Sequence, residues 1–520
     1  MELERSFLRK LELSESADNV LSGALDRFPP LIIDRCLQGA KSELINTLVA
    51  EFSSGGRPVD AETITMPRRI GHGPRPARIS TTAARVLYRA LVRSLETTLP
   101  EESRRPENWD RFSRFDEEHG KNYLVHADIA ACYEYIDHGR LRTEILTQSM
   151  SLDSARSIGQ LLGEIMGTNR GLPQMHWASD RLGDAYLDIL VRYLGRHGIE
   201  TVRYVDDIKA GADNWDGALR VVELAAEAAR GLGLALSAEK TKILRRTTMD
   251  VQRASERSIF ASYFQKALGE VQEDDDIFSL VGPYGELIQV DRQEPDQAND
   301  QELHQALMEA FWSLAMDWYA FEQAEDTLLE ADRVKHRQLQ QWLPSALGAL
   351  SIHTKRLPDS LLGQWAFKDP SAIRPIVSYV LLRTDEPTLE HENPWASIEI
   401  LMDKTRRSPW SLVWLLYGAG RLARKYPSDD RSRKVKNWSK DRMHDLYEIV
   451  RAEAAWTTAC FGSMSSAELT RCYRDATSLT QSALAASMIK QGSSIGNSVR
   501  QAIRDDGPLN RKAIEWAEGF

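Results

Sequence analysis

Two adjacent aspartates interrupt an apolar run near the middle of the chain, where residues 203–208 read Arg-Tyr-Val-Asp-Asp-Ile. The run predicts a β-strand, and two like charges at the tip of a strand are costly unless cations neutralise them. Hard cations such as Mg²⁺ prefer carboxylate oxygens, so Asp206 and Asp207 are candidate metal ligands. The alternative interpretation is a plain β-turn, in which aspartate is common.

A second strand-like run, Tyr-Leu-Val-His-Ala-Asp, ends at Asp128, and an aromatic residue, Tyr133, follows five residues later. Phosphoryl transfer with two metal ions needs carboxylates from separate strands that bridge ions roughly 4 Å apart. One ion activates the attacking hydroxyl and the other stabilises the leaving pyrophosphate. Asp128 is therefore the expected partner of Asp206 in such a site.

Residues 63–95 contain no acidic residue but are rich in arginine. The arginines of this window are Arg68, Arg69, Arg75, Arg78, Arg85, Arg89 and Arg93. Because the last three recur every four residues, one interpretation is a solvated basic helix face. The other is phosphate binding, for which the first four are the candidates, because a guanidinium binds phosphate oxygens in a bidentate manner.

The length of the chain predicts two or three domains. Residues 1–60 read as helical, with breaks at Pro29-Pro30 and at residues 53–56. Residues 63–244 mix short β-type runs with helices, which is typical of an α/β or α+β domain. A linker-like region follows, with an acidic run at residues 273–276, a Gly282-Pro283 turn and a polar stretch at residues 291–301.

Beyond residue 300 the pattern becomes helical, because apolar residues from Leu303 to Phe321 step by four and three along one helix face. Three further helix starts combine a capping side chain with proline at the first helical position. They are Asp369-Pro370, Asn393-Pro394 and Ser408-Pro409. Shifting the first start onto the third by 39 residues superposes three apolar positions, which indicates helical-hairpin repeats of roughly 40 residues, as in HEAT-like arrays.

The bulk composition excludes some classes of protein. A formal net charge of −10 argues against a protein that coats nucleic acid through bulk positive charge. The four cysteines match neither a zinc site nor a disulfide framework, which fits a reducing cytoplasm. The N-terminus lacks the pattern of a secretion signal, and no stretch approaches the apolar length of a membrane span. We expect a cytoplasmic protein without a membrane partner.

Two more segments complete an ordered series. A Gly171-Leu-Pro-Gln174 turn runs into a helix that contains Ser179, Leu182, Tyr186 and Leu187, and Lys240-Thr241 follows the aspartate pair. In this order, the Asp128 strand, the GLPQ turn, the YVDD box and the Lys240 segment resemble the palm motifs of reverse transcriptases. The resemblance covers about residues 65–245.

The resemblance implies an α+β right-hand polymerase with fingers, palm and thumb, followed by the all-α HEAT-like region. The implied boundaries are an N-terminal helical extension (1–60), fingers and palm (61–250), a thumb or linker (251–300) and the helical-repeat domain (301–520). The arginine-rich window would belong to the fingers.

The resemblance also assigns roles to residues. The catalytic set is Asp128, Asp206 and Asp207, and Ile129 joins these three in a site for two Mg²⁺ ions, with Mn²⁺ as the alternative. The residues implied to contact the dNTP are Tyr133, Gln174, Arg68, Arg69, Arg75, Arg78 and Lys240.

Tyr133 occupies the position at which a bulky side chain would clash with a ribose 2′-hydroxyl, so dNTPs are favoured over NTPs. Its alternative role is to fill the core. The chain departs from the family at Met175 and His176, where many members have a small glycine. That departure bears on the template or nucleotide contacts expected at the turn.

A palm followed by helical repeats resembles the abortive-infection and other defence-associated reverse transcriptases of bacteria. This implies DNA synthesis on a non-coding RNA template or without a template, with a DNA product, priming from nucleic acid or a protein hydroxyl, and a homo-oligomer. Two alternatives are a retron-like or group II intron-like enzyme that copies a dedicated RNA, and a catalytically idle RNA-binding scaffold. The three intact carboxylates argue against the scaffold.

Overall fold

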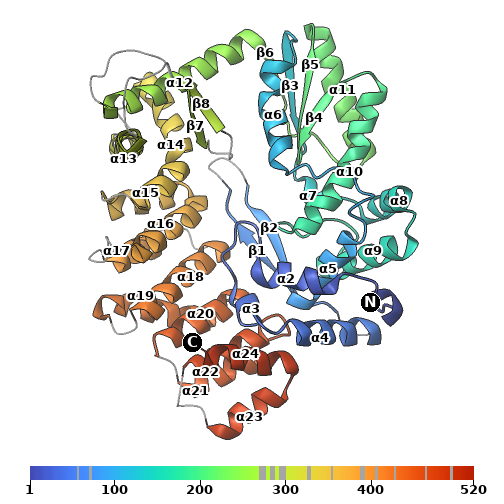
Figure 1. Ribbon diagram of the computed structural model, residues 1–520, viewed down its shortest axis with the longest axis vertical. Helices are drawn as coiled ribbons and strands as arrows, with labels where there is room; N and C mark the ends of the chain where they lie inside the picture. The colour runs from blue at the N-terminus through green and yellow to red at the C-terminus, as the bar shows by residue number, and fades with distance from the viewer. Residues whose placement is uncertain are drawn as a thin grey trace.

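The computed structural model describes residues 1–55, 58–68, 73–268, 277–281, 287–291, 300–324, 329–352, 355–386, 393–404, 408–426, 429–462, 465–491 and 496–519. The α/β part of the chain, which contains the central sheet, lies on one side of the molecule, and the C-terminal helices lie on the other (Figure 1). The N-terminal helices lie between the lower ends of these two parts in this view. Three parts of the expected linker lie outside the described residues: its acidic run at residues 273–276, the Gly282-Pro283 turn and residues 292–299 of its polar stretch.

The N-terminal half begins with helices and a hairpin. These elements are α1 (Arg5–Leu8), α2 (Leu13–Ser22), α3 (Ile32–Arg35), α4 (Lys41–Ser54), β1 (Ala61–Met66) and β2 (Arg75–Ser80). Helices α5 (Thr82–Arg93), α6 (Pro106–Glu118), α7 (Cys132–Tyr135), α8 (His138–Ser149), α9 (Leu152–Met166), α10 (Trp177–Arg196), α11 (Trp215–Gly231) and α12 (Arg246–Leu268) accompany the central sheet. A small hairpin, β7 (Ile277–Val281) and β8 (Leu287–Asp291), follows α12.

The central sheet has four antiparallel strands in the order β4-β5-β3-β6. They are β3 (Tyr123–Asp128), β4 (Thr201–Tyr204), β5 (Asp207–Ala212) and β6 (Lys242–Arg245). Successive side chains of a strand point to opposite faces, so Leu124 packs with Phe112 of α6 on one face while Val125 packs with Val221 of α11 on the other. Burial on both faces fixes the register of the strands.

The C-terminal region is helical. It comprises α13 (Asp300–Gln323), α14 (Glu330–Leu350), α15 (Asp359–Lys368), α16 (Ile373–Asp385), α17 (Pro394–Lys404), α18 (Pro409–Lys425), α19 (Arg433–Asp441), α20 (Glu448–Cys460), α21 (Ser466–Arg474), α22 (Gln481–Lys490), α23 (Asn497–Asp505) and α24 (Pro508–Glu518). The even-numbered helices from α14 to α24 pack in series, and α15, α17 and α19 form a second row beside them. None of the described helices combines the length and apolar character needed to cross a bilayer.

The three capping side chains expected from the sequence are confirmed. Asp369 accepts from the Ser371 amide at 3.0 Å, and Asn393 accepts from the Trp395 amide at 3.1 Å. Ser408 accepts from the amide of Ser411, the third residue of α18, at 3.1 Å. At Asp369 the cap begins a 3₁₀ turn, Pro370–Ala372, before α16 starts at Ile373.

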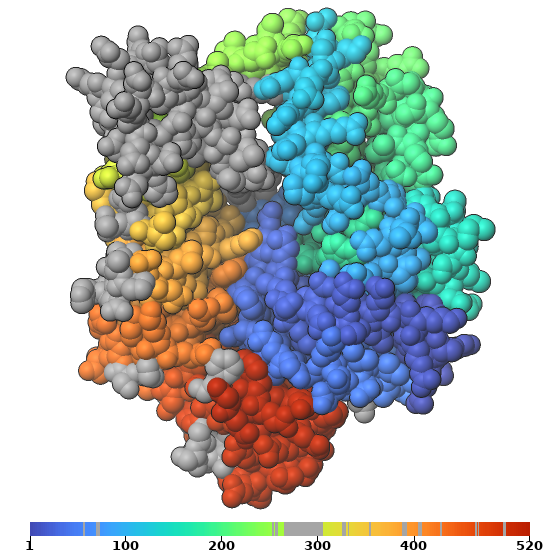
Figure 2. Space-filling model, in the orientation of Figure 1, coloured from blue at the N-terminus to red at the C-terminus, as the bar shows by residue number. Residues whose placement is uncertain are grey.

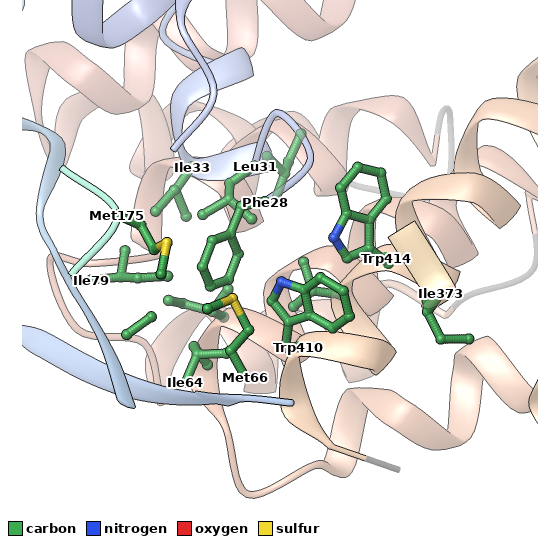
Figure 3. Packing of buried hydrophobic residues seen from close by; sticks show 14 of the residues in the cluster. Phe28, Leu31, Ile33, Ile64, Met66, Ile79, Met175, Ile373, Trp410 and Trp414 are labelled. Atoms are coloured by element: carbon green, nitrogen blue, oxygen red, sulfur yellow. The ribbon is translucent and has the colours of Figure 1, made fainter. Parts of the chain in front are cut away.

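The N-terminal segment packs against the C-terminal helices, and one hydrophobic core extends from Leu3 to Ala517. In Figure 3, Phe28 and Leu31 lie beside Met66 of β1 and the indoles of Trp410 and Trp414. Both indole N–H groups donate to the carbonyl of Arg27, at 2.8 and 3.0 Å. Figure 2 shows that the N-terminal helices and the last C-terminal helices also adjoin on the surface.

Candidate metal centre

The end of β3 and the tip of the β4–β5 hairpin bring three carboxylates together. Asp128 is the last residue of β3 and pairs in register with Asp207, the first residue of β5. One carboxylate oxygen from each of Asp128, Asp206 and Asp207 lies within 4.8 Å of the other two. We refer to these residues as the carboxylate cluster. The structure therefore places side by side the two motifs that are 78 residues apart in the sequence.

A very tight turn places Asp206 at the tip of the hairpin. Tyr204 pairs with Asp207, so only Val205 and Asp206 connect the two strands. Val205 has φ = 55°, a left-handed conformation that is unfavourable for a β-branched residue. The carbonyl of Asp206 accepts a hydrogen bond from the Ile129 amide at 3.3 Å, which ties the turn to the end of β3. The turn interpretation and the metal-ligand interpretation of the Asp-Asp pair are thus compatible.

The pKa values of Asp128 and Asp206 are both raised, first by burial and then by neighbouring carboxylates. Burial raises the pKa of Asp128 to about 6, and the charges of Asp206 and Asp207 act in the same direction, although a hydrogen bond from Lys240 opposes them. Burial, followed by the charge of Asp207, also raises the pKa of Asp206. Lys240 Nζ lies 2.6 Å from Asp128 Oδ1. One ammonium group does not balance three carboxylates, so the donor set fits divalent cations that prefer oxygen ligands.

The remaining contacts orient the cluster. His126, two residues before Asp128 on β3, places Nε2 3.1 Å from Asp207 Oδ1. Ile129 has no side-chain ligand atom, so only its backbone carbonyl could contribute to a metal site. These neighbours leave the oxygens of Asp128 and Asp206 facing a common space.

A cavity of about 240 Å³ opens at the carboxylate cluster. Most of the residues predicted to form the site line it: Arg68, Arg75, Asp128, Ile129, Tyr133, Gln174, Asp206 and Lys240. We call this space the site cavity. Its lining combines the carboxylates of Asp128 and Asp206 with arginine and lysine side chains, an arrangement that suits a phosphate ester held by metal ions and cations.

The arginine window divides into separate groups. Burial and the charge of Arg75 lower the pKa of Arg68, and Asp206 and Asp128 oppose that shift, which places this guanidinium in the field of the cluster. Arg78 points elsewhere, because it donates to the Ile165 carbonyl at 2.8 Å and to Thr63 at 3.0 Å. Arg69 lies outside the described residues.

The interpretation of a solvated helix face is wrong for Arg85. Its guanidinium is buried and forms a bidentate ion pair with Asp34 of α3. Arg89 stacks over the Trp177 ring, with its Cζ 4.5 Å from the ring centroid. Arg93 is an ion-pair partner of Glu12 and Glu15. Each of these arginines thus holds an N-terminal or α10 segment against α5.

Tyr133 lies at the wall of the site cavity and is held by a carboxylate. Its hydroxyl donates to Asp180 Oδ1 at 2.7 Å, and Asp180 also pairs with Arg104 at 3.2 Å. The ring lies against Gly183 of α10, where an added Cβ would come within 3.5 Å of the ring's Cζ. The ring is therefore fixed between α7 and α10 rather than free to rotate.

Met175 and His176, the departures from the family pattern, are both buried. Met175 adopts φ = 72°, a conformation that favours glycine, yet its side chain packs among Ile79 and Ile33 in the core (Figure 3). Burial lowers the pKa of His176 to about 3, so the ring is neutral and its Nε2 contacts the Arg78 carbonyl at 3.3 Å. The GLPQ turn is thus braced by β2 and the N-terminal segment.

Several residues of the site escaped the sequence analysis. Arg104 and Asp180 line the site cavity, and Arg203 bonds the carbonyl of Val205 at 2.6 Å. The sequence shows that Arg203 directly precedes the Tyr-Val-Asp-Asp box, but it gives no sign that Asp184 of α10 is its partner. For Arg104, nothing in the sequence connects the loop before α6 to α10.

Residues 71–268 match the family model described as reverse transcriptase (RNA-dependent DNA polymerase). The chain contains a reverse transcriptase domain. This domain includes the carboxylate cluster, Tyr133, Gln174 and Lys240.

No curated protein matches the chain. Among solved structures, it is similar to a telomerase from Candida albicans determined in complex with a fragment of telomeric RNA, at 9% identity. That similarity covers 76% of this chain and 67% of the telomerase chain, with a TM-score of 0.25.

Proposed function

We propose that this protein is an RNA-directed DNA polymerase that adds dNTPs by two-metal nucleotidyl transfer. The observation that supports it best is the carboxylate cluster, which lies at a cavity lined by cations inside the reverse transcriptase domain. A primer hydroxyl would attack the α-phosphorus, a new phosphodiester bond would form and pyrophosphate would leave.

Asp128, Asp206 and Asp207, with the Ile129 carbonyl, are the proposed ligands for Mg²⁺ or Mn²⁺. Such ions supply a lowered pKa for the attacking hydroxyl and charge stabilisation for the leaving group. Arg68 and Arg75, which line the site cavity, are the proposed triphosphate ligands. Lys240, which now bonds Asp128, lines the same cavity and can turn to a phosphate oxygen once other cations neutralise that carboxylate.

The test is incorporation of dNTPs on a primed RNA template by the purified protein. Asp128→Asn and Asp206→Asn should each lose about 10³-fold or more in rate with the fold retained. Asp216→Asn, an exposed aspartate at the start of α11, is the matched control and should be unaffected. Undiminished incorporation by a folded Asp128 or Asp206 variant would exclude the mechanism.

We further propose that the enzyme acts in bacterial antiphage defence, on a non-coding RNA template or without a template, and that the C-terminal helices form a HEAT-like array that places RNA or a second copy of the chain. The proposal rests on the resemblance of the domain order to defence-associated enzymes. Phage plaques should be fewer with the native gene and its flanking DNA than with Asp206→Ala.

Sequencing the nucleic acid that copurifies with the protein distinguishes this role from the alternatives. A single dedicated RNA with a DNA copy, together with equal phage plaques for the native gene and Asp206→Ala, would favour the retron-like or group II intron-like enzyme. Copurified RNA without any DNA product would favour the idle scaffold. Native mass measurement of the same preparation reports whether the chain forms a homo-oligomer.

A further inference from the structure

A buried arginine connects α10 to the turn that carries Asp206. Arg203 is on β4, and its side chain is only 10% exposed. One of its terminal nitrogens lies 2.9 Å from Asp184 Oδ1 on α10, and the other donates to the carbonyl of Val205 at 2.6 Å. We call this set of contacts the Arg203 bridge. It connects α10, the helix that follows the GLPQ turn, to the tip of the β4–β5 hairpin.

The turn at Val205 needs such support. A β-branched residue at φ = 55° is an outlier that persists only when the surroundings hold it. The Val205–Asp206 peptide joins this outlier to the metal-ligand candidate, and a flip of that peptide would change ψ of Val205 and φ of Asp206 and so move the Asp206 carboxylate relative to Asp128. The bond from Arg203 fixes the Val205 carbonyl, which is the oxygen that such a flip would rotate.

Asp184 is a rigid end for the bridge. It is 2% exposed, and its second oxygen accepts from Arg181 at 3.1 Å and from the Ser103 amide at 3.1 Å. A buried carboxylate with both oxygens bonded to charged or backbone donors holds one orientation. A planar guanidinium can bond this carboxylate and a carbonyl at once, whereas a lysine ammonium is a single point charge.

We propose that Arg203 is a positioning residue that holds the Asp206 turn in the geometry required for metal binding. The proposal deepens the polymerase function proposed above and depends on it for its kinetic consequences. Arg203 is not among the residues that line the site cavity, so it would act on the metal site through Val205 and Asp206.

The chain offers a closely matched control in Arg181. Its guanidinium is also buried, pairs with the same carboxylate of Asp184 and bonds a backbone carbonyl, that of Pro100, at 2.6 Å. It does not contact the hairpin turn. Arg181→Lys and Arg203→Lys therefore disturb similar buried ion pairs, and only the second removes a contact to the turn.

Hydrogen exchange on the metal-free protein provides a readout that needs no activity. The Ile129 amide reports on the turn because it bonds the Asp206 carbonyl, whereas the next amide, Ala130, bonds Ala235 at 2.9 Å. Arg203→Lys should accelerate exchange at Ile129 relative to Ala130 by about tenfold, the effect expected from losing a charged hydrogen bond. Arg181→Lys should change that ratio far less, because the Ser103 amide still holds Asp184 and the bond from Arg203 to Val205 remains.

Kinetics provide the second readout. Arg203→Lys should lower kcat for dNTP addition by about 10²-fold, as a misplacement of about 1 Å can do, and should raise the metal concentration for half-maximal activity. The KM for dNTP should stay within about twofold, because the triphosphate contacts are elsewhere. Equal losses in Arg181→Lys and Arg203→Lys, or an unchanged Ile129 exchange ratio, would overturn the proposal. A wild-type protein without polymerase activity would instead refute the proposed function, and the exchange experiment would still decide the bridge.

Discussion

At the scale of single residues, the pKa of Asp128 predicts how metal binding depends on pH. Burial raises this pKa to about 6, and a metal ion binds only the ionised carboxylate. Protons therefore compete with the metal below about pH 6. The apparent metal affinity should fall by up to about tenfold per pH unit as the pH drops through this range, which titration with Mn²⁺ at several pH values would measure.

The same shift has a consequence for stability. The folded-state pKa of Asp128 lies above the ordinary value of 3.8, so the folded protein binds the proton more tightly than the unfolded chain does. The stabilisation from this proton is present below about pH 4 and is lost as the pH rises through about 6. The metal-free wild type should lose stability relative to Asp128→Asn over that window, and added Mg²⁺ should restore it only in the wild type. An identical pH dependence of Tm in the two proteins would contradict the shift.

Tyr133 is predicted to exclude ribonucleotides by its ring and not by its hydroxyl. Tyr133→Ala should raise the ratio of kcat/KM for NTP to that for dNTP, because the bulk beneath the sugar is gone. Tyr133→Phe is the matched control: it keeps the ring, loses only the bond to Asp180, and should keep most of the discrimination. If Ala and Phe give the wild-type ratio alike, Tyr133 is a core residue and not a gate.

At the scale of elements, the β1–β2 hairpin carries one arginine that lines the site cavity and another that bonds to the surrounding fold. Arg75 begins β2 and lines the site cavity, whereas Arg78 on the same strand bonds the Ile165 carbonyl and Thr63. Arg75→Ala should raise the KM for dNTP by about tenfold, the effect of one lost charged hydrogen bond, with little change in Tm. Arg78→Ala should lower Tm and leave KM near its wild-type value. Loss of template affinity with unchanged nucleotide kinetics in Arg75→Ala would reassign this arginine to nucleic-acid binding.

The sequence predicts best those features that depend on residues close together in the chain. Asp128, Asp206 and Asp207 stand at strand ends whose patterns lie within a few residues, and the helix caps of Asp369, Asn393 and Ser408 depend on amides two or three positions away. Arg85 was misread because its partner Asp34 lies 51 residues upstream. A long-range ion pair leaves no periodic pattern, so a buried arginine and a solvated one look alike in the sequence.

At the scale of the whole molecule, the N-terminal segment and the C-terminal helices supply hydrogen-bond partners to each other. Glu62 of β1 accepts hydrogen bonds from the amides of Glu448 and Ile449, at 2.7 and 2.9 Å, and so caps α20. Glu453 of α20 is fully buried, and its carboxylate accepts hydrogen bonds from the Ile32 amide and the Arg35 guanidinium. Removing one member of a buried ion pair leaves the charge of the other buried and uncompensated, which is strongly destabilising. The C-terminal helices are therefore part of the framework that holds the arginine-bearing hairpin and the GLPQ turn.

This arrangement predicts the outcome of dividing the chain between residues 295 and 296. The N-terminal piece alone exposes the apolar surface of Phe28, Leu31 and Met66 that otherwise faces Trp410 and Trp414 (Figure 3), so it should aggregate or unfold without a cooperative transition. Coexpressed with residues 296–520, it should copurify as a complex, since α12 also packs on α13 through Phe260 and Phe311. If the piece 1–295 stays monomeric and melts at the Tm of the full chain, the C-terminal helices are not needed for the polymerase domain to fold. A loss of phage protection on truncation would then be assigned to the placement of RNA or of a second subunit, and not to unfolding of the core.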